Sequence, residues 1–190
     1  MSGPLLAVAR SLAAEWPAVA FVEADAQTYR APDPFDVVLS RNGLMLFDDL
    51  DAAFANLAAN LRPGGRIVFS TWAEAESNAW ATIPNAAVAA HVRLPAAPEG
   101  PCAFALADPA RVQAVLRRAG FGSVTLRRVD TDLWVASDVS DAVAFVARSL
   151  PLPADVKRRI VATLRVTLVP YARPDGVWLP SAAWLVSATL

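Results

Sequence analysis

Two short apolar segments separated by a helical pattern place the strongest constraint on how this 190-residue chain folds. Residues 35–40 (FDVVLS) and 67–72 (IVFSTW) are the kind of apolar run shown by parallel strands that are covered on both faces. Between them, residues 50–61 repeat apolar side chains at helical spacing, with aspartates placed to cap the first turn. We expect the glycines of "RPGGR" (62–66) to end that helix. This order of strand, helix and strand predicts an α/β sandwich around a mostly parallel sheet.

The rest of the chain continues the alternation, with more inserted material. We expect further strands at 19–24, 122–134 and 182–189, and helices at 4–14, 109–119, 139–149 and 154–169. Asp108 and Pro109 supply a side-chain cap and a first-turn proline to the second of these helices, and Gly120 supplies its stop signal. We interpret residues 1–190 as one domain with cap-like insertions at about 73–107 and 138–172, the first of which contains a proline-rich stretch (94–101).

Composition excludes several classes of protein. No apolar run approaches the roughly 18 residues that a membrane span needs, and no basic residues precede the first apolar stretch as in a secretory signal. Cys102 is the single cysteine, which excludes an internal disulfide and a cysteine-based zinc site. The net charge of −1 offers no basic field for nucleic acid. We therefore expect a cytoplasmic protein without a nucleic-acid or membrane partner.

Candidate ligand-binding residues directly follow the predicted strands. In open α/β sheets, ligands bind beyond the carboxyl ends of the strands. Three short segments occupy such positions, namely residues 25–27 (DAQ), residues 40–42 (SRN) and residues 71–72 (TW). These segments are the first places to look for a site.

The segment "EADAQTYR…FDVVLSRNGLMLFDDLDAAFANLAANLRPGGRIVFSTW" (23–72) resembles the middle of a class I S-adenosylmethionine-dependent methyltransferase. It is similar to the small-molecule group related to the ubiquinone and menaquinone biosynthesis enzymes. Three later motifs, "NAW-TIP", "FALADPARVQAVLRRAGF" and "AAWLVSA", also resemble that group, so the similarity covers nearly the whole chain. The resemblance implies a Rossmann-like methyltransferase sandwich whose last strand runs antiparallel to its neighbours. It also implies an enzyme that uses S-adenosylmethionine to methylate a small molecule.

The resemblance further implies that the N-terminal part of the family's fold is missing. In that family, "SGPLLAVAR" (2–10) is the helix after the second strand, preceded by a glycine-rich loop and an acidic residue that binds the ribose. We expect either a truncated start or a remnant gene, with two strands absent between 19–24 and 35–40. The strand at 19–24 then either pairs directly with 35–40 or leaves the N-terminal 30 residues loose. Self-association through the open sheet edge is expected in solution.

The resemblance assigns cofactor contacts residue by residue. Asp25 would accept a hydrogen bond from the adenine amino group, and the backbone amide of Ala26 would meet a ring nitrogen. Residues 40–42 would face the methionine end. The cofactor-binding candidates are Asp25, Ala26, Gln27, Ser40, Arg41 and Asn42. The simpler alternatives are that Asp25 only closes a turn, that Arg41 forms a surface ion pair, and that Asn42 is a loop residue.

Trp72, Asn78 and Trp80 flank the region where a substrate would enter, although packing alone also explains them. The single histidine, His91, lies beside the proline-rich stretch and is expected to be solvated or partly packed. The acidic run at 48–51 is expected to cap a helix, and we predict no metal site. Because a sulfonium methyl donor is already activated, alignment of the acceptor supplies most of the catalysis. We therefore assign no catalytic residue.

Three functions remain open at this stage. The first is methyl transfer from S-adenosylmethionine to a small molecule, impaired if the start is truncated. The second is a non-catalytic remnant that acts as a binding domain. The third is a nicotinamide-dependent oxidoreductase. No G-x-G-x-x-G motif occurs, but a truncated start would hide it too, so the downstream motifs are what count against this function.

Overall fold

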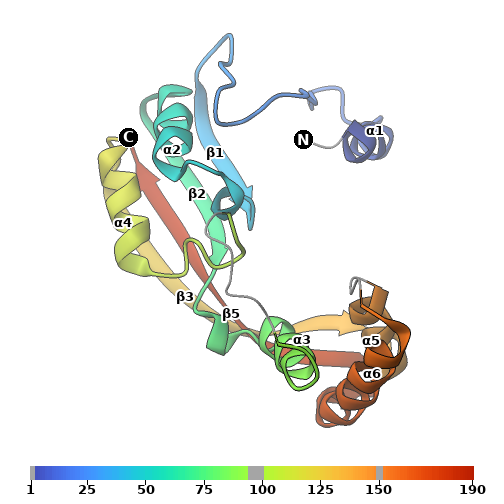
Figure 1. Cartoon of the computed structure of the whole chain (residues 1–190). Coiled ribbons are helices and arrows are strands. Elements are labelled where there is room, and N and C mark those ends of the chain that lie inside the picture. The colour runs from blue at the N-terminus through green and yellow to red at the C-terminus, as the bar shows by residue number, and fades with distance from the viewer. Residues whose placement is uncertain (1–2, 94–100, 149–151) are drawn as a thin grey trace.

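The computed structural model describes residues 3–93, 101–148 and 152–190. Its centre is a twisted sheet with the strand order β1-β2-β5-β3, and a short strand β4 pairs with β5 (Figure 1). The strands are β1 (Phe35–Arg41), β2 (Leu61–Trp72), β3 (Gly122–Ala136), β4 (Ala172–Arg173) and β5 (Gly176–Thr189). The described part of the proline-rich stretch is limited to Pro101, because residues 94–100 lie outside the described ranges.

The strand directions agree with the predicted fold. β1 and β2 are parallel, while β5 is antiparallel to β2, to β3 and to β4. All the other strands therefore run in one direction, and β5 alone runs against them. The predicted antiparallel last strand is confirmed.

Two helices, α2 (Leu50–Ala59) and α4 (Pro109–Arg118), cover one face of the sheet (Figure 1). Asp49 caps α2 by accepting a hydrogen bond from the Ala52 amide, and Asp108 caps α4 in the same way from Ala110. Phe54 of α2 packs edge-on against Phe69 of β2, with 5.7 Å between ring centroids. Both predicted caps are confirmed, and this packing forms the main core.

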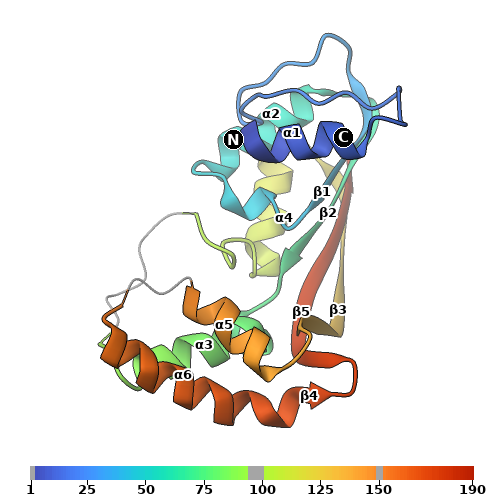
Figure 2. The same ribbon diagram turned by 90° about the vertical axis from the view of Figure 1, so that its right-hand side faces the viewer.

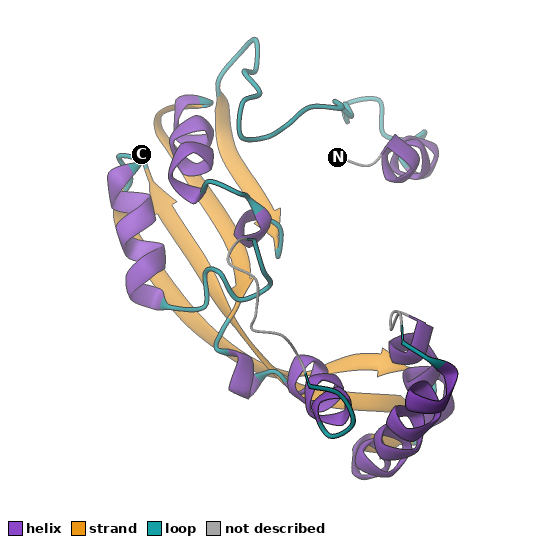
Figure 3. Ribbon diagram, in the orientation of Figure 1, coloured by secondary structure: helices purple, strands orange, loops and turns teal. Residues whose placement is uncertain are grey.

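A second apolar cluster lies at the other end of the two longest strands, β3 and β5. It is formed by α3 (Ala79–Ala89), α5 (Val139–Arg148) and α6 (Ala154–Leu168), which gather beside those strand ends (Figure 3). Ile160 and Leu164 of α6 are fully buried there, as is Val177 of β5. We call this group of helices the helical lobe. β3 and β5 take part in both cores and so connect them.

The N-terminal region departs from the sequence-based expectation. Helix α1 (Gly3–Leu12) buries no side chain and stands apart from the sheet in Figure 1. Residues 19–24 form no strand, and β1 pairs only with β2 among the described residues. The predicted strand at 19–24 is wrong because an apolar run becomes a strand only where a neighbour supplies hydrogen bonds. Of the two outcomes expected for residues 19–24, direct pairing with 35–40 is not found among the described residues.

Residues 25–31, by contrast, are held against α2. The Asn56 amide donates to the carbonyls of Ala26 and Tyr29, and the Asn60 amide donates to Tyr29. The backbone amide of Ala31 donates to the Asn60 side chain at 2.7 Å. Both asparagines are buried, so this loop is fixed by satisfied polar contacts rather than by sheet pairing.

A second correction concerns the end of α2. The helix ends at Ala59 with Asn60 as its C-cap, and "RPGGR" belongs to β2 instead of stopping the helix. Gly64 has a φ of 76° and lies where the pairing of β1 with β2 shifts register, between the pairs Phe35–Leu61 and Val37–Arg66. The glycines therefore mark an irregularity at the start of β2 and do not end the helix.

Candidate functional site

The predicted binding residues come together in groups at the carboxyl ends of β1 and β2. The first group surrounds a cavity of about 460 Å³, formed by residues 24–27 and residues 46–48. We call it the loop cavity. It lies just beyond β1, because residues 46–48 are the last residue of the short helix after that strand (Leu44–Leu46) and the two residues that follow it. This is the position at which open α/β sheets bind ligands.

Asp25 combines a turn function with an available carboxylate at the loop cavity. One carboxylate oxygen accepts from the backbone amide of Gln27 at 2.9 Å, and the Asp25 carbonyl accepts from Tyr29. The side chain is exposed, so its second oxygen can accept from a ligand. Among the described residues, the Ala26 amide has no protein acceptor. Gln27 is engaged differently, since its side-chain oxygen accepts from the Asp49 amide.

The second group is formed by residues 40–42 at the end of β1. Asn42 has a φ of 50°, a left-handed conformation that asparagine tolerates better than most residues. Its side-chain oxygen accepts from the Ser70 hydroxyl at 2.9 Å, and its backbone amide donates to the Ser70 carbonyl. Asn42 is therefore fixed to the end of β2. Arg41 is exposed and forms no ion pair within the described ranges, contrary to the simpler alternative for that residue.

The third group is aromatic. Trp72 is the last residue of β2, and its ring lies 4.9 Å from that of Trp80 on α3. Trp80 also stacks on Phe104, with centroids 5.7 Å apart. The aromatic series runs from the end of the sheet into the helical lobe.

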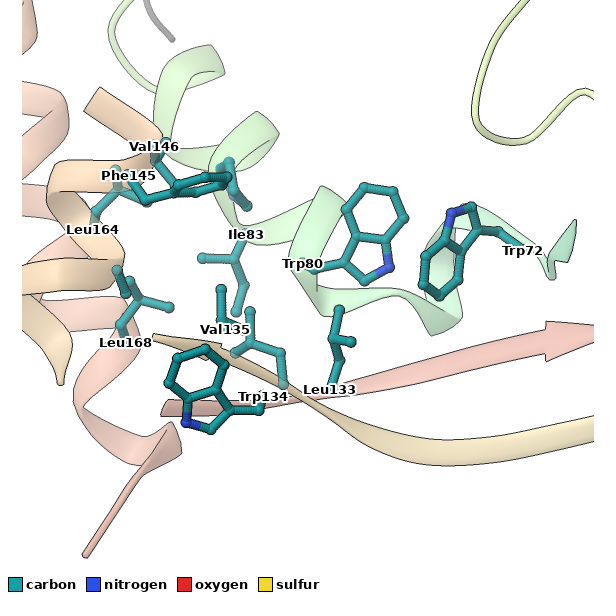
Figure 4. A pocket seen from close by; sticks show the side chains of 13 residues that line it. Trp72, Trp80, Ile83, Leu133, Trp134, Val135, Phe145, Val146, Leu164 and Leu168 are labelled. Carbon is teal, nitrogen blue, oxygen red and sulfur yellow. The ribbon is translucent and has the colours of Figure 1, made fainter. Parts of the chain in front are cut away.

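Trp72 and Trp80 form one end of an apolar cavity of about 280 Å³ inside the helical lobe (Figure 4). The labelled side chains in Figure 4 come from β2, β3, α3, α5 and α6 and gather around one space, with Trp72 beyond Trp80 at its edge. The lining residues are Trp72, Trp80, Ile83, Pro84, Leu133, Trp134, Val135, Ala142, Phe145, Val146, Leu164, Leu168 and Leu179. We refer to it below as the apolar cavity.

Asn78 does not face this cavity. Its side chain is fully buried, and its amide nitrogen donates to backbone carbonyls at the end of β2 and on β5. Its oxygen accepts from the Trp80 indole, the Ser181 hydroxyl and the Ala182 amide. Every hydrogen-bonding position of the side chain is thus occupied. These contacts are those of the packing alternative, in which Asn78 holds Trp80 in place.

Other polar candidates have structural partners. His91 is partly buried, and its ring nitrogen lies 2.8 Å from the Thr163 hydroxyl of α6. Asp51 forms an ion pair with Arg118, which links α2 to α4. In the ranges that the structure describes, no cluster of possible metal ligands is found. Those ranges also contain no helix that is both long and apolar enough to cross a membrane.

Sequence patterns missed several residues of these cavities. Phe47 lines the loop cavity, and its position in the run "LMLF" after β1 was the available signal. Trp134 and Phe145 line the apolar cavity, yet they come from segments read only as a strand and a helix. Their side chains are about half exposed, at 50% and 56%, which marks where the cavity opens.

Comparisons with known proteins identify the fold. Residues 1–69 match a family model described as a methyltransferase domain. Among curated proteins, none matches the chain in sequence. Among solved structures, the YcgJ protein of Bacillus subtilis is similar with a TM-score of 0.60 and 18% identity, covering 99% of this chain and 79% of that one. A methyltransferase candidate from Bacillus halodurans gives a TM-score of 0.61 and 13% identity, covering 100% and 80%.

The chain has the fold of the class I S-adenosylmethionine-dependent methyltransferases. The resemblance inferred from sequence is thereby confirmed for the fold, and residues 1–69 match a methyltransferase domain in sequence. The cyclase SpnF is also similar, with a TM-score of 0.51 and 20% identity, covering 98% of this chain and 64% of its own. The methyltransferase fold therefore accompanies more than one kind of chemistry, and the reaction has to be argued from the site.

Proposed function

We propose that this chain acts in methyl transfer from S-adenosylmethionine to a small-molecule acceptor. The observation that carries the proposal is that an available Asp25 carboxylate oxygen and an Ala26 amide with no acceptor among the described residues lie side by side at the loop cavity. An acceptor and a donor on adjacent residues match the exocyclic amino group and the neighbouring ring nitrogen of adenine. The hydrogen bonds from Asn56 hold this turn rigid.

The remaining residues fit the rest of such a cofactor. Phe47 supplies an apolar wall beside the Asp25 turn, which suits a flat ring. Residues 40–42 lie beyond the end of β1 and are proposed to face the methionine end. When bound, the cofactor supplies an activated methyl group, so the chain's own residues have to bind, orient and exclude water. We propose the helical lobe as the cap that positions the acceptor, with Trp72 and Trp80 between the two sites.

We expect weak binding of S-adenosylmethionine, with a Kd in the range from about 10 μM to 1 mM, because the described contacts come from a few hydrogen bonds worth about 1 kcal/mol each. Isothermal titration calorimetry with S-adenosylmethionine tests this. Asp25→Ala should weaken binding about tenfold, whereas Asp33→Ala, an exposed aspartate in the next loop, should leave it unchanged.

Three other outcomes of this experiment would each contradict part of the proposal. An unchanged affinity in the Asp25→Ala variant removes Asp25 from the site. The absence of saturable binding up to millimolar concentration favours a non-catalytic binding domain. Binding of a nicotinamide dinucleotide in place of S-adenosylmethionine favours an oxidoreductase.

We further propose that the chain self-associates through the edge of β1. This strand pairs only with β2 among the described residues, so its other edge presents backbone groups that can pair with a second chain. Leu39 on this strand is 74% exposed and lies beside Val68 of β2 on the face opposite α2 and α4. Apolar surface at an open edge favours such pairing.

A further inference from the structure

The apolar cavity carries an inference about the acceptor, and this inference rests on the proposed methyl transfer. We infer that the acceptor is a neutral, largely apolar molecule that enters the helical lobe, with one hydrogen-bond acceptor directed toward Trp72. Three observations support this inference: the apolar lining of the cavity, the hydrogen bonds of its indole groups, and the position of Trp72 on β2.

The lining of the cavity provides no partner for a charge. All of its side chains are hydrocarbon, proline or indole groups. A charged or strongly polar ligand would lose its water there without receiving compensating hydrogen bonds, which costs several kcal/mol. Arg148, whose guanidinium lies 5.7 Å from the Phe145 ring centroid, is not part of the lining. The cavity therefore favours neutral apolar ligands.

The three tryptophans of the cavity differ in the state of their indole N–H groups. Trp80 donates to the Asn78 side chain at 3.0 Å, and Trp134 donates to the Asp175 carbonyl at 3.2 Å. Within the described ranges, the Trp72 indole N–H has no protein acceptor, and Trp72 as a whole is half-buried. Trp72 is thus the indole of this cavity that is left to donate to a ligand. This points to one polar atom at that end of the molecule.

The position of Trp72 links the cavity to the proposed cofactor site. Trp72 lies beyond Trp80 at the β2 end of the cavity (Figure 4). It is two residues after Ser70, a separation of about 7 Å along a strand. Ser70 is the residue that fixes Asn42. A polar atom held by Trp72 would therefore lie on the side of the cavity that faces the methyl donor, where the atom to be methylated has to be.

The size of the cavity limits the acceptor. A volume of about 280 Å³ is near the lower end of the roughly 300–1000 Å³ typical of small-molecule sites. One or two fused rings or a short hydrocarbon chain would fill it. The exposed rims at Trp134 and Phe145 provide an opening for a longer tail.

The test measures direct binding of small probes to the whole chain by equilibrium dialysis, without cofactor. We expect 1-naphthol to bind at least about tenfold more tightly than 1-naphthalenesulfonate or a naphthylmethyl trimethylammonium ion. Trp72→Phe keeps an aromatic ring but removes the N–H. This variant should weaken binding of 1-naphthol about threefold to tenfold and leave binding of naphthalene unchanged.

A charged side chain placed in the cavity provides a second test of the inference. Ile83→Glu should abolish binding of 1-naphthol, whereas Val166→Glu, at a position on α6 that is 76% exposed, should not change it. Circular dichroism checks that both variants are folded, and the Trp72→Phe comparison decides the matter if Ile83→Glu is not. Equal binding of charged and neutral probes, or no binding of 1-naphthol, overturns the inference. Failure of S-adenosylmethionine to bind while 1-naphthol still binds overturns only the proposed function.

Discussion

Asn78 connects three elements through one side chain, and its loss should be among the more damaging single changes in this protein. The amide joins the end of β2 to β5 and holds the Trp80 indole. Asn78→Ala leaves several buried polar groups without partners, so we expect the free energy of unfolding to fall by about 2–4 kcal/mol. Urea denaturation measures this change. Asn85→Ala, on the exposed side of α3, is the control and should change it by less than about 0.5 kcal/mol.

The same residue shows which site details the sequence can supply. Asp49 and Asp108 were predicted as caps because a cap depends on residues two or three positions away. Asn78 was predicted to bind substrate, but its main partner, Ala182, is 104 positions away. No local pattern reports such a contact. Residue types near strand ends therefore located the site region, whereas the function of each polar side chain required the fold.

At the scale of elements, the sequence predicted the helices and most strands well because each carries its own periodicity. β1, β3 and the helices α2, α4, α5 and α6 lie within a few residues of their predicted bounds. The exceptions depend on pairing. β5 begins at Gly176, ahead of the predicted 182, because β3 continues alongside it as a partner. Residues 19–24 have a similar apolar pattern, but no described strand pairs with them and they form no strand.

The exposed edge of β1 gives a prediction at this scale. Leu39→Lys places a charge beside the open edge, and charged side chains oppose pairing between sheet edges. We expect the wild-type chain to show a concentration-dependent dimer in sedimentation velocity and Leu39→Lys to reduce its population about tenfold. Val166→Lys is a matched control, since Leu39 and Val166 are similarly exposed, at 74% and 76%. A wild-type chain that stays monomeric at high concentration contradicts the prediction.

At the scale of the whole molecule, two long strands make the sheet and the helical lobe depend on each other. β3 has 15 residues and β5 has 14, more than twice the usual five or six residues of a strand. Each strand therefore extends over about 50 Å. Their upper halves form the main core with α2 and α4, and their lower ends form the lobe (Figure 2). The apolar cavity belongs to the lobe, so its shape depends on a register set in the sheet. Because of this dependence, the apolar cavity could not be predicted from the sequence alone.

The hydrogen bonds that join the segment after β2 to β3 are also sensitive to acid. Glu74 follows the end of β2, where it accepts hydrogen bonds from Ser77 and from Arg128 of β3. The Ser77 hydroxyl, a backbone hydrogen bond and Arg128 together lower the pKa of Glu74 from 4.5 to about 2. A carboxyl group whose pKa is lower in the folded state stabilises the fold fully above its unfolded pKa. That contribution is lost as the pH falls from about 4.5 toward 2.

We therefore expect the free energy of unfolding to decrease over that pH range, with Glu74→Gln removing part of the decrease. The part due to Glu74 should be at most about 1 kcal/mol, because solvent screens an ion pair between partly exposed side chains. Thermal unfolding at pH 5, 4 and 3 measures it, with Glu76→Gln, an exposed neighbour, as the control. The wild type and Glu76→Gln should lose stability in parallel, while Glu74→Gln should begin lower at pH 5 and approach them at pH 3. Parallel curves for all three proteins would show that the Glu74 contacts do not contribute to the stability of the fold.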